Sequence, residues 1–223
     1  MKRERPIIAI DGPAGAGKST VARKTAERLG FVLVDTGALY RTVALAAKRR
    51  GIDWSNADKT SELARDLAEK GAIVLEPGQR VLLEGEDVSK EIRTPDVSMG
   101  ASTVSAHPGV RAALLDMQRS AGKNGGVVLE GRDIGTVVFP DAEKKFFLTA
   151  RPEVRARRRC DELRAKGQEA DYEATLREVQ KRDEQDSTRA IAPLKKADDA
   201  ELVDTSDMTI EQAVEHLVTR VRA

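Results

Sequence analysis

Short apolar runs alternate along the chain with longer stretches in which apolar residues recur every three or four positions. Each short run is nearly continuous in aliphatic or aromatic residues, which is typical of a parallel strand covered on both faces. The predicted strands are residues 6–11, 31–35, 126–130, 145–149 and 201–204. The predicted helices are residues 18–29, 38–50, 108–120, 153–166, 173–185 and 210–222. This alternation predicts a three-layer α/β/α sandwich around a five-stranded parallel sheet.

One stretch departs from this alternation. Residues 72–76, 80–85 and 86–88 have the pattern of short antiparallel strands, with a Pro77-Gly78 turn after the first, and they follow a predicted helix at 57–70. We therefore expect one folded unit, with an insertion at about residues 57–105 that contains a small antiparallel sheet. The core then comprises about residues 1–56, 106–154 and 186–223.

Several residues predict where helices begin and end. Gly30 and Gly51 stand directly after predicted helices, where a left-handed residue is favoured. Thr209 and Gln212 have the spacing of a capping box for the last helix. Thr36 is a predicted N-cap for the helix that follows the second strand.

Charge and composition narrow the function. Lysine and arginine total 38 against 37 acidic residues, so the net charge of +1 predicts no general affinity for nucleic acid or membranes. Aromatic residues make up 3% of the 223 residues, too few for the stacking platforms of single-strand binders. The single cysteine, Cys160, fits a reducing compartment, and no apolar run has the length of a signal peptide or membrane span. We expect a cytoplasmic protein whose anion sites come from local arginine clusters.

Residues 12–19 match the phosphate-loop motif G-x-x-x-x-G-K-[ST] between a predicted strand and a predicted helix. The glycines allow backbone N–H groups to surround a phosphate, and the helix N-terminus adds its positive dipole end. Lys18 is expected to bridge the β- and γ-phosphates of ATP, and the Ser19 hydroxyl to bind Mg²⁺. No guanine-specific Asn-Lys-x-Asp motif is present in the sequence, which argues against a GTPase. The expected ATP contacts in this segment are Gly12, Pro13, Ala14, Gly15, Ala16, Gly17, Lys18, Ser19 and Thr20.

Two arginine-bearing segments follow other strands at their carboxyl ends. Arg41 belongs to the segment 35–41 after the second strand, and Arg132 belongs to the segment 131–136 after the third. In an open α/β sheet, ligands bind at the carboxyl ends of the strands. Two such arginines beside a phosphate loop therefore predict a second anion site, for the phosphate of an acceptor.

Two further groups of charged residues lie later in the chain. Arg182, Asp186 and Arg189 are spaced by four and three residues, so they share one helical face if the helix extends that far. Taken alone, such a face is more often a solvated, salt-bridged surface. Residues 155–159 include four arginines, of which we expect one or two, Arg158 among them, to contact ATP from a lid of about residues 155–185.

Several segments together resemble the bacterial cytidylate kinase family. They cover nearly the whole chain in order: IDGPAGAGKST from residue 10, DTGALYR from 35, LEGEDVS from 83, GRDIGTVVFP from 131 and RAIAPL from 189. The resemblance implies a P-loop NTPase core with a lid and a nucleotide-binding insertion. It also implies transfer of the γ-phosphoryl group of ATP to CMP or dCMP, with Mg²⁺, usually by a monomer.

Phosphoryl transfer requires charge stabilisation, which we assign to Lys18, Arg132 and Arg182. Either Glu130 or Asp35 would hold metal-bound waters, and the sequence does not choose between them. The residues that the resemblance implies around the acceptor nucleotide are Thr36, Tyr40, Arg41, Ser102, Arg111, Arg132, Asp133, Arg182, Asp186 and Arg189. Two alternatives remain: another small-molecule P-loop kinase, acting on UMP, AMP or shikimate, and a nucleotide-dependent switch protein with a protein partner.

Overall fold

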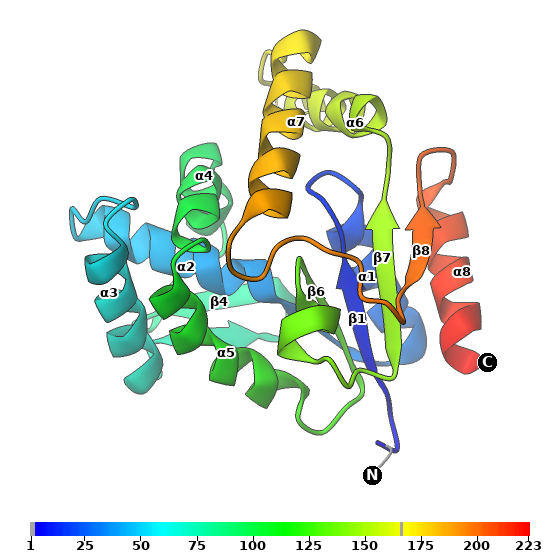
Figure 1. The fold of residues 1–223 in the computed structure, drawn as a ribbon, viewed down its shortest axis with the longest axis horizontal. Coiled ribbons are helices and arrows are strands. Elements are labelled where there is room, and N and C mark those ends of the chain that lie inside the picture. The colour runs from blue at the N-terminus through cyan, green and yellow to red at the C-terminus, as the bar shows by residue number, and fades with distance from the viewer. Residues whose placement is uncertain (1–2, 166) are drawn as a thin grey trace. The chain divides into compact units, whose positions relative to one another are not determined.

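The computed structural model of the protein describes residues 3–165 and 167–223 (Figure 1). The chain divides into two compact units. The first comprises the chain up to Phe31 together with Gly126–Ala223, and the second comprises Val32–Gly125. Among the described residues, no helix is long and apolar enough to span a membrane.

The larger sheet confirms the predicted five-stranded parallel arrangement, with strand order β2-β6-β1-β7-β8. Its strands are β1 (Ile7–Asp11), β2 (Val32–Asp35), β6 (Val127–Gly131), β7 (Lys144–Thr149) and β8 (Glu201–Asp204). Every residue of β1 is buried because this strand pairs with β6 on one side and β7 on the other. The central position of β1 places the residues that follow Asp11 at the carboxyl edge of the sheet.

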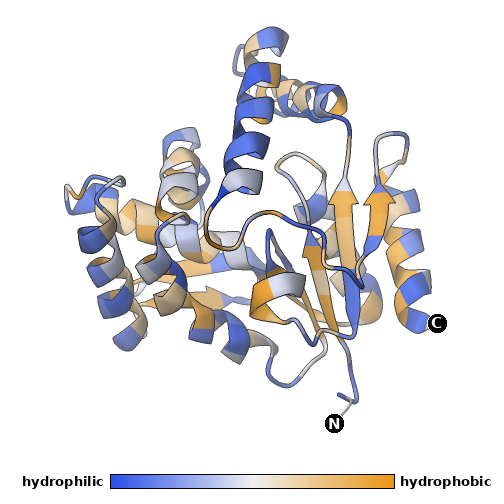
Figure 2. Cartoon of the chain, in the orientation of Figure 1, coloured by the Kyte–Doolittle hydropathy of each residue, from blue (hydrophilic) through white to orange (hydrophobic). Residues whose placement is uncertain are grey.

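The helices of the first unit are α1 (Lys18–Leu29), α6 (Pro152–Ala165), α7 (Tyr172–Thr188) and α8 (Ile210–Arg222). Helix α1 packs against α8, and α6 packs against α7. Gly30 ends α1 with φ of 63°, and Thr209 with Gln212 forms the predicted capping box of α8. Figure 2 shows that α7 is hydrophilic along most of its length, and only Thr175 and Asp186 are buried in this helix.

The second unit combines four helices with a small antiparallel sheet. The helices are α2 (Thr36–Arg49), α3 (Ala57–Glu69), α4 (Pro95–Val104) and α5 (Pro108–Gly122). The sheet contains β3 (Ile73–Glu76), β4 (Arg80–Leu83) and β5 (Glu86–Asp87), in that order, as predicted. The two hairpin partners Ile73 and Leu83 both lie in an apolar core that also includes Leu45 and Leu67. One hydrophobic cluster therefore holds this unit together.

Helix α4 and a π-helical turn are among the elements that the sequence pattern does not predict. Helix α4 carries small residues and little amphipathic contrast, and Gly100 in it faces Trp54 so closely that a Cβ would lie 2.4 Å from the indole. A single turn of π-helix, Ile134–Val138, follows β6. The predicted division of the chain into a core, an insertion at 57–105 and a lid at 155–185 stays a prediction.

Candidate active site

The phosphate loop joins β1 to α1, which confirms the strand–loop–helix context. Gly12 and Gly17 adopt positive φ values of 148° and 84°. At Gly12 a Cβ would lie 1.9 Å from the carbonyl oxygen of Leu148 in β7, so only glycine fits there. The loop therefore packs directly on the neighbouring strand before it turns into the helix.

Lys18 is a buried cation in this loop, with a side chain that donates to the Pro13 carbonyl at 2.7 Å. Burial lowers the pKa of Lys18 well below its usual value, and the nearby charge of Arg132 lowers it further. Glu130 and Asp186 act in the opposite direction, while Arg182 again lowers it. Lys18, Arg132 and Arg182 lie close enough to affect one another, and together with the backbone N–H groups of the loop they are suited to bind an anionic ligand.

Ser19 and Glu130 form a pair of oxygen ligands next to Lys18. The Ser19 hydroxyl donates to Oε2 of Glu130 at 2.9 Å. Mg²⁺ prefers hard oxygen donors, retains several waters and is held by one or two carboxylates, so these two residues fit it. The other candidate carboxylate, Asp35, is engaged in its own unit: one oxygen accepts from Ala38 N at 3.1 Å and the other from Arg41 at 2.6 Å.

Asp11 ends β1 and holds the segment that carries Arg132 and Asp133. Its two carboxylate oxygens accept hydrogen bonds from the backbone N–H groups of Ile134 and Gly135, both at 2.8 Å. Burial raises the pKa of Asp11 to about 6, although both hydrogen bonds act to lower it. Nothing in the sequence pattern singles out this residue except that it is the one charged residue of an otherwise apolar strand.

Asp186 connects Arg132 to the end of α7. Arg132 Nε donates to Oδ2 of Asp186 at 2.8 Å, and the other oxygen of Asp186 pairs with Arg189. Asp186 is only 2% exposed. Burial alone would raise its pKa, but the charges of Arg132 and Arg189 outweigh it and lower the pKa. The helix ends at Thr188, so Arg189 lies just beyond it. This segment is therefore not the solvated surface face that its spacing alone would favour.

The second unit contains the other residues that were predicted to contact the acceptor. The guanidinium of Arg111 lies 5.5 Å from the ring centre of Tyr40 and donates to the Ser105 carbonyl at 3.2 Å. The Ser105 hydroxyl in turn donates to the carbonyl of Ser102 at 2.9 Å. Arg111 is therefore held in one orientation by an aromatic face and a backbone carbonyl.

The start of α2 corrects one prediction. Asp35, not Thr36, is the N-cap, because its side chain accepts from Ala38 N while Thr36 is already the first helical residue. Thr36 is only 3% exposed. Among the described residues, Arg41 pairs with Asp35 through Nη2, and its buried Nε has no hydrogen-bond partner. A strand-end carboxylate can fill the capping position as well as threonine can, which the sequence pattern alone does not resolve.

The arginines of α6 point in different directions, as expected for four in five residues. Arg155 is buried, whereas Arg157 is exposed. Arg158 donates to the Thr205 carbonyl at 2.6 Å, and the hydroxyl of Thr205 donates to the phosphate-loop carbonyl of Ala16 at 3.2 Å. A contact between Arg158 and ATP remains a prediction.

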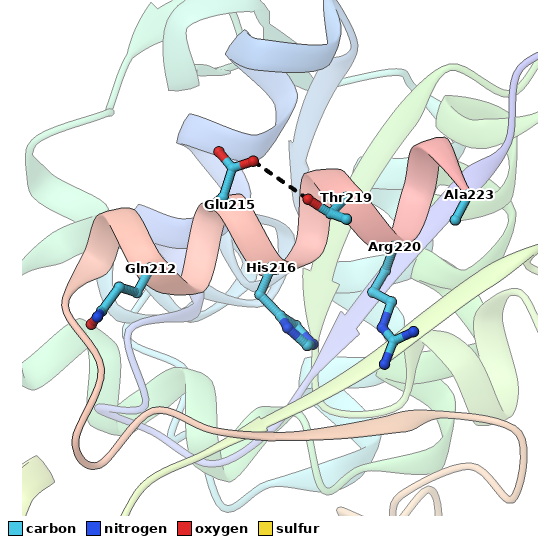
Figure 3. A pocket seen from close by; sticks show the side chains of 6 residues that line it. All are labelled: Gln212, Glu215, His216, Thr219, Arg220 and Ala223. Carbon is cyan, nitrogen blue, oxygen red and sulfur yellow. Dashed lines mark hydrogen bonds between the residues drawn. The ribbon is translucent and has the colours of Figure 1, made fainter.

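A hollow of about 400 Å³ lies elsewhere, along α8 (Figure 3). It is lined by Gln212, Glu215, His216, Thr219, Arg220 and Ala223. His216 contacts Glu201 of β8 at 2.6 Å, and Glu215 accepts from Thr219 within the helix. The hollow contains none of the phosphate-loop or acceptor candidates. Within residues 3–165 and 167–223, no cluster of three or more His, Cys, Asp or Glu residues could hold a metal ion by itself.

Comparison with known proteins identifies what this arrangement is similar to. The family model described as cytidylate kinase matches residues 8–223. A cytidylate kinase from Pelotomaculum thermopropionicum is 52% identical over 218 residues, which cover 98% of this chain and 96% of that protein. A cytidylate kinase from Pseudomonas aeruginosa strain PAO1 is 53% identical over 96% of this chain and 93% of its own length.

Solved structures agree on the fold. A gluconokinase from Sinorhizobium meliloti superposes with a TM-score of 0.50 at 15% identity, over 99% of this chain and 94% of that chain. An uncharacterized protein from Eubacterium ventriosum gives a TM-score of 0.51 at 14% identity, over 98% of this chain and 99% of that chain. At such low identity these likenesses show the fold alone.

Proposed function

The chain belongs to the cytidylate kinase family, and we propose that it transfers the γ-phosphoryl group of ATP to CMP or dCMP, giving ADP and CDP or dCDP. The observation that carries this proposal is the group of cations at the phosphate loop, where the buried Lys18 lies within the field of Arg132 and Arg182. Burial and repulsion from Arg132 and Arg182 lower the pKa of Lys18, and a bound anion would relieve the repulsion. A nucleoside triphosphate would supply such an anion.

The reaction asks mainly for positioning and charge stabilisation from the protein. The attacking group is a phosphate oxygen that is already anionic, so no catalytic base is needed. We assign charge stabilisation at the transferred group to Lys18, Arg132 and Arg182. Asp186 holds Arg132 at 2.8 Å and thereby fixes the direction in which its remaining N–H groups point. Preorganised donors of this kind stabilise the transition state without having to reorient during the reaction.

Ser19 and Glu130 are the residues that would hold Mg²⁺ with ATP. The ion would neutralise charge on the β- and γ-phosphates. Glu130 is the better carboxylate for the metal-bound waters, because it already accepts from the Ser19 hydroxyl, whereas both oxygens of Asp35 serve Arg41 and the N-terminus of α2. We therefore choose Glu130 over Asp35.

The acceptor contacts that the family implies are consistent with the chemistry of each residue. Arginine can only donate hydrogen bonds and an ionised aspartate can only accept them. Arg111 is suited to the N3 and O2 acceptors of cytosine, and Asp133 to its amino group. Arg41 carries a buried Nε that can serve an acceptor phosphate. We further propose that the protein is cytoplasmic, which agrees with its single cysteine, and that it acts as a monomer, as the family implies.

One assay tests the function. ADP release is measured with ATP and Mg²⁺ in the presence of one acceptor at a time, taken from CMP, dCMP, UMP, AMP and shikimate. A reaction without any acceptor is the control. We expect turnover that depends on CMP or dCMP, and EDTA should abolish it. Turnover on another acceptor, but not on CMP, would assign the chain to a different small-molecule kinase. Slow turnover indifferent to every acceptor would favour the switch-protein alternative.

A further inference from the structure

Arg155 joins three separate segments of the first unit through one buried guanidinium. Its Nε donates to the carbonyl of Ala150, just beyond β7, at 2.8 Å. Its Nη1 donates to the phosphate-loop carbonyl of Ala14 at 3.1 Å. Nη1 and Nη2 of Arg155 also donate to the two carboxylate oxygens of Asp183 in α7, at 2.8 and 2.5 Å. A strand end, the phosphate loop and a helix distant in sequence are therefore bonded to the same planar ion.

The packing around Arg155 leaves little freedom. Its side chain is 3% exposed, whereas that of Asp183 is 29% exposed. A Cβ on Gly15 would lie 3.2 Å from the Cβ of Arg155, so the phosphate loop and α6 are in close contact here. A bidentate arginine–carboxylate pair defines direction as well as distance, because both partners are planar.

Asp183 lies in α7 close to two side chains whose charges act on Lys18. It directly follows Arg182 and precedes Asp186 by three residues, so it lies within one turn of both. The charges of Arg182 and Asp186 both act on Lys18. A rotation or shift of α7 relative to the phosphate loop would therefore change the distances of these charges from Lys18.

We propose that Arg155 and Asp183 are positioning residues that lock the register of α7 against the phosphate loop, so that Arg182 and the Arg132–Asp186 pair face the transferred phosphoryl group. Neither residue needs to touch a nucleotide. The proposal rests on the proposed function, because it assigns a role in the same phosphoryl transfer. It also separates Arg155 from the predicted ATP-contacting arginines of α6.

The burial of Arg155 is consistent with a role in positioning. An ion pair in which one charge is buried contributes little net stability compared with well-packed apolar residues, since that charge loses its water. Apolar residues could not select one orientation of α7 as a bidentate pair does. Lysine could keep the charge of Arg155 but could not bond Ala14, Ala150 and both oxygens of Asp183 at once.

The experiment compares Arg155→Lys, Asp183→Asn and the double variant with the wild type. Glu162→Gln is the matched control, because Glu162 is also an acidic partner of an α6 arginine, but its pair with Arg159 is exposed and 3.4 Å long. For each protein we measure the melting temperature, kcat, the KM for ATP and the KM for CMP. We also measure the ratio of CDP formed to ADP released. The ratio reports whether ATP is hydrolysed without transfer, a fault that a purely structural role would not produce.

We expect each single substitution to lower kcat about tenfold or more with smaller changes in KM for ATP, since misplacement of charge by about 1 Å has effects of this size. The double variant should resemble the poorer single variant, because either change breaks the same link. The CDP-to-ADP ratio should fall below that of wild type, and Glu162→Gln should match wild type.

Two outcomes would overturn the proposal. One is that folded Arg155→Lys and Asp183→Asn proteins keep kcat within about twofold of wild type, even if they melt earlier. The other is that the two effects multiply in the double variant, which would mean that the residues act independently. Failure of the proposed function is recognised separately, since the wild type itself would then form no CDP.

Discussion

The two units of the protein place their charges differently. In the phosphate-loop unit, Asp11, Lys18, Arg155 and Asp186 are all at least 94% shielded from solvent, with exposures of 5%, 6%, 3% and 2%. In the second unit, the most extensive ion pairs lie at the surface. Arg49 bridges Glu86 and Glu91 with its side chain 34% exposed, while Arg50 pairs with Glu84 at 40% exposure.

The interiors of the two units also differ in how much charge they contain. The second unit is held by a continuous apolar cluster in which Leu45, Leu67 and Leu114 are almost fully buried. In the first unit, buried charges lie at the edge of an apolar sheet, and each is held by named partners. Buried charge opposes folding, whereas exposed ion pairs contribute little in either direction. The most deeply buried charges therefore gather around the phosphate loop, whereas the ion pairs of Arg49 and Arg50 in the second unit lie at the surface.

The largest effect is expected from Lys18→Ala, which tests the contrast between the two units. Removal of a buried cation whose pKa is strongly lowered should leave the protein folded, because the desolvated charge is lost with it. Activity should nevertheless fall by a factor of about 100 to 1,000 or more, since one preorganised charge supplies several kcal/mol to the transition state. The paired readouts are kcat for CDP formation and the melting temperature. Near-normal turnover in a folded variant would break the comparison at its strongest point.

Arg111 is the exception within the second unit, a cation that is only 9% exposed. If it reads the cytosine edge, Arg111→Met should lower the ratio of kcat/KM for CMP to that for UMP by about tenfold or more, since one mismatched buried hydrogen bond costs about 1–3 kcal/mol. Arg50→Met, at an exposed position in the same unit, serves as the control and should keep the ratio. An unchanged ratio in Arg111→Met would show that buried charge in this unit is structural.

Much of the fold could be predicted from the sequence because its signals are local. Alternating apolar runs and a glycine-rich turn after Ile7–Asp11 predict the parallel sheet and the phosphate loop. Helix α4 could not be predicted, because Pro95–Val104 consists largely of small residues. Its packing depends on a contact between Gly100 and Trp54, which lies elsewhere in the chain. Such a contact leaves no periodic pattern.

The candidate site was partly predictable for the same reason. The roles of motif residues such as Lys18 and Ser19 can be predicted from their spacing in the sequence. The positioning residues do not: Asp11 acts on Ile134, and Arg155 on Asp183, and in both cases the partner is far away in the sequence. Within the run of four arginines, no local signal distinguishes the buried Arg155 from its exposed neighbour Arg157.

A smaller effect is expected at Asp11. Its pKa in the folded protein is about 6, above the ordinary 3.8, so between these values the folded state binds more protons than the unfolded state. The contribution of Asp11 to stability therefore falls as the pH rises. The difference in the free energy of unfolding between wild type and Asp11→Asn should fall by about 2 kcal/mol from about pH 4 to about pH 7. Urea unfolding at each pH measures it.

An exposed aspartate supplies the control of opposite sign. Lys145 lowers the pKa of Asp199 by a hydrogen bond, so the stability that Asp199 contributes is present above its unfolded pKa and lost as the pH falls. The difference between wild type and Asp199→Asn should therefore grow with pH. If both differences had the same sign, the buried and the exposed carboxylate of the first unit would not differ in how their charge affects stability.

The smallest effect is expected at Arg49, whose pKa is raised by hydrogen bonds to Glu86 and Glu91. Although it joins α2 to two later segments, its head group is partly hydrated, and exposed ion pairs contribute about 0.2–1 kcal/mol. Arg49→Met keeps the apolar stem of the side chain and removes only the charge. The free energy of unfolding should fall by about 1 kcal/mol or less, and the loss should shrink in high salt because exposed charges are screened. CDP formation should be unchanged. A larger loss of stability that salt does not reduce would mean that this network behaves like the buried charges around the phosphate loop, and the contrast between the two units would no longer hold.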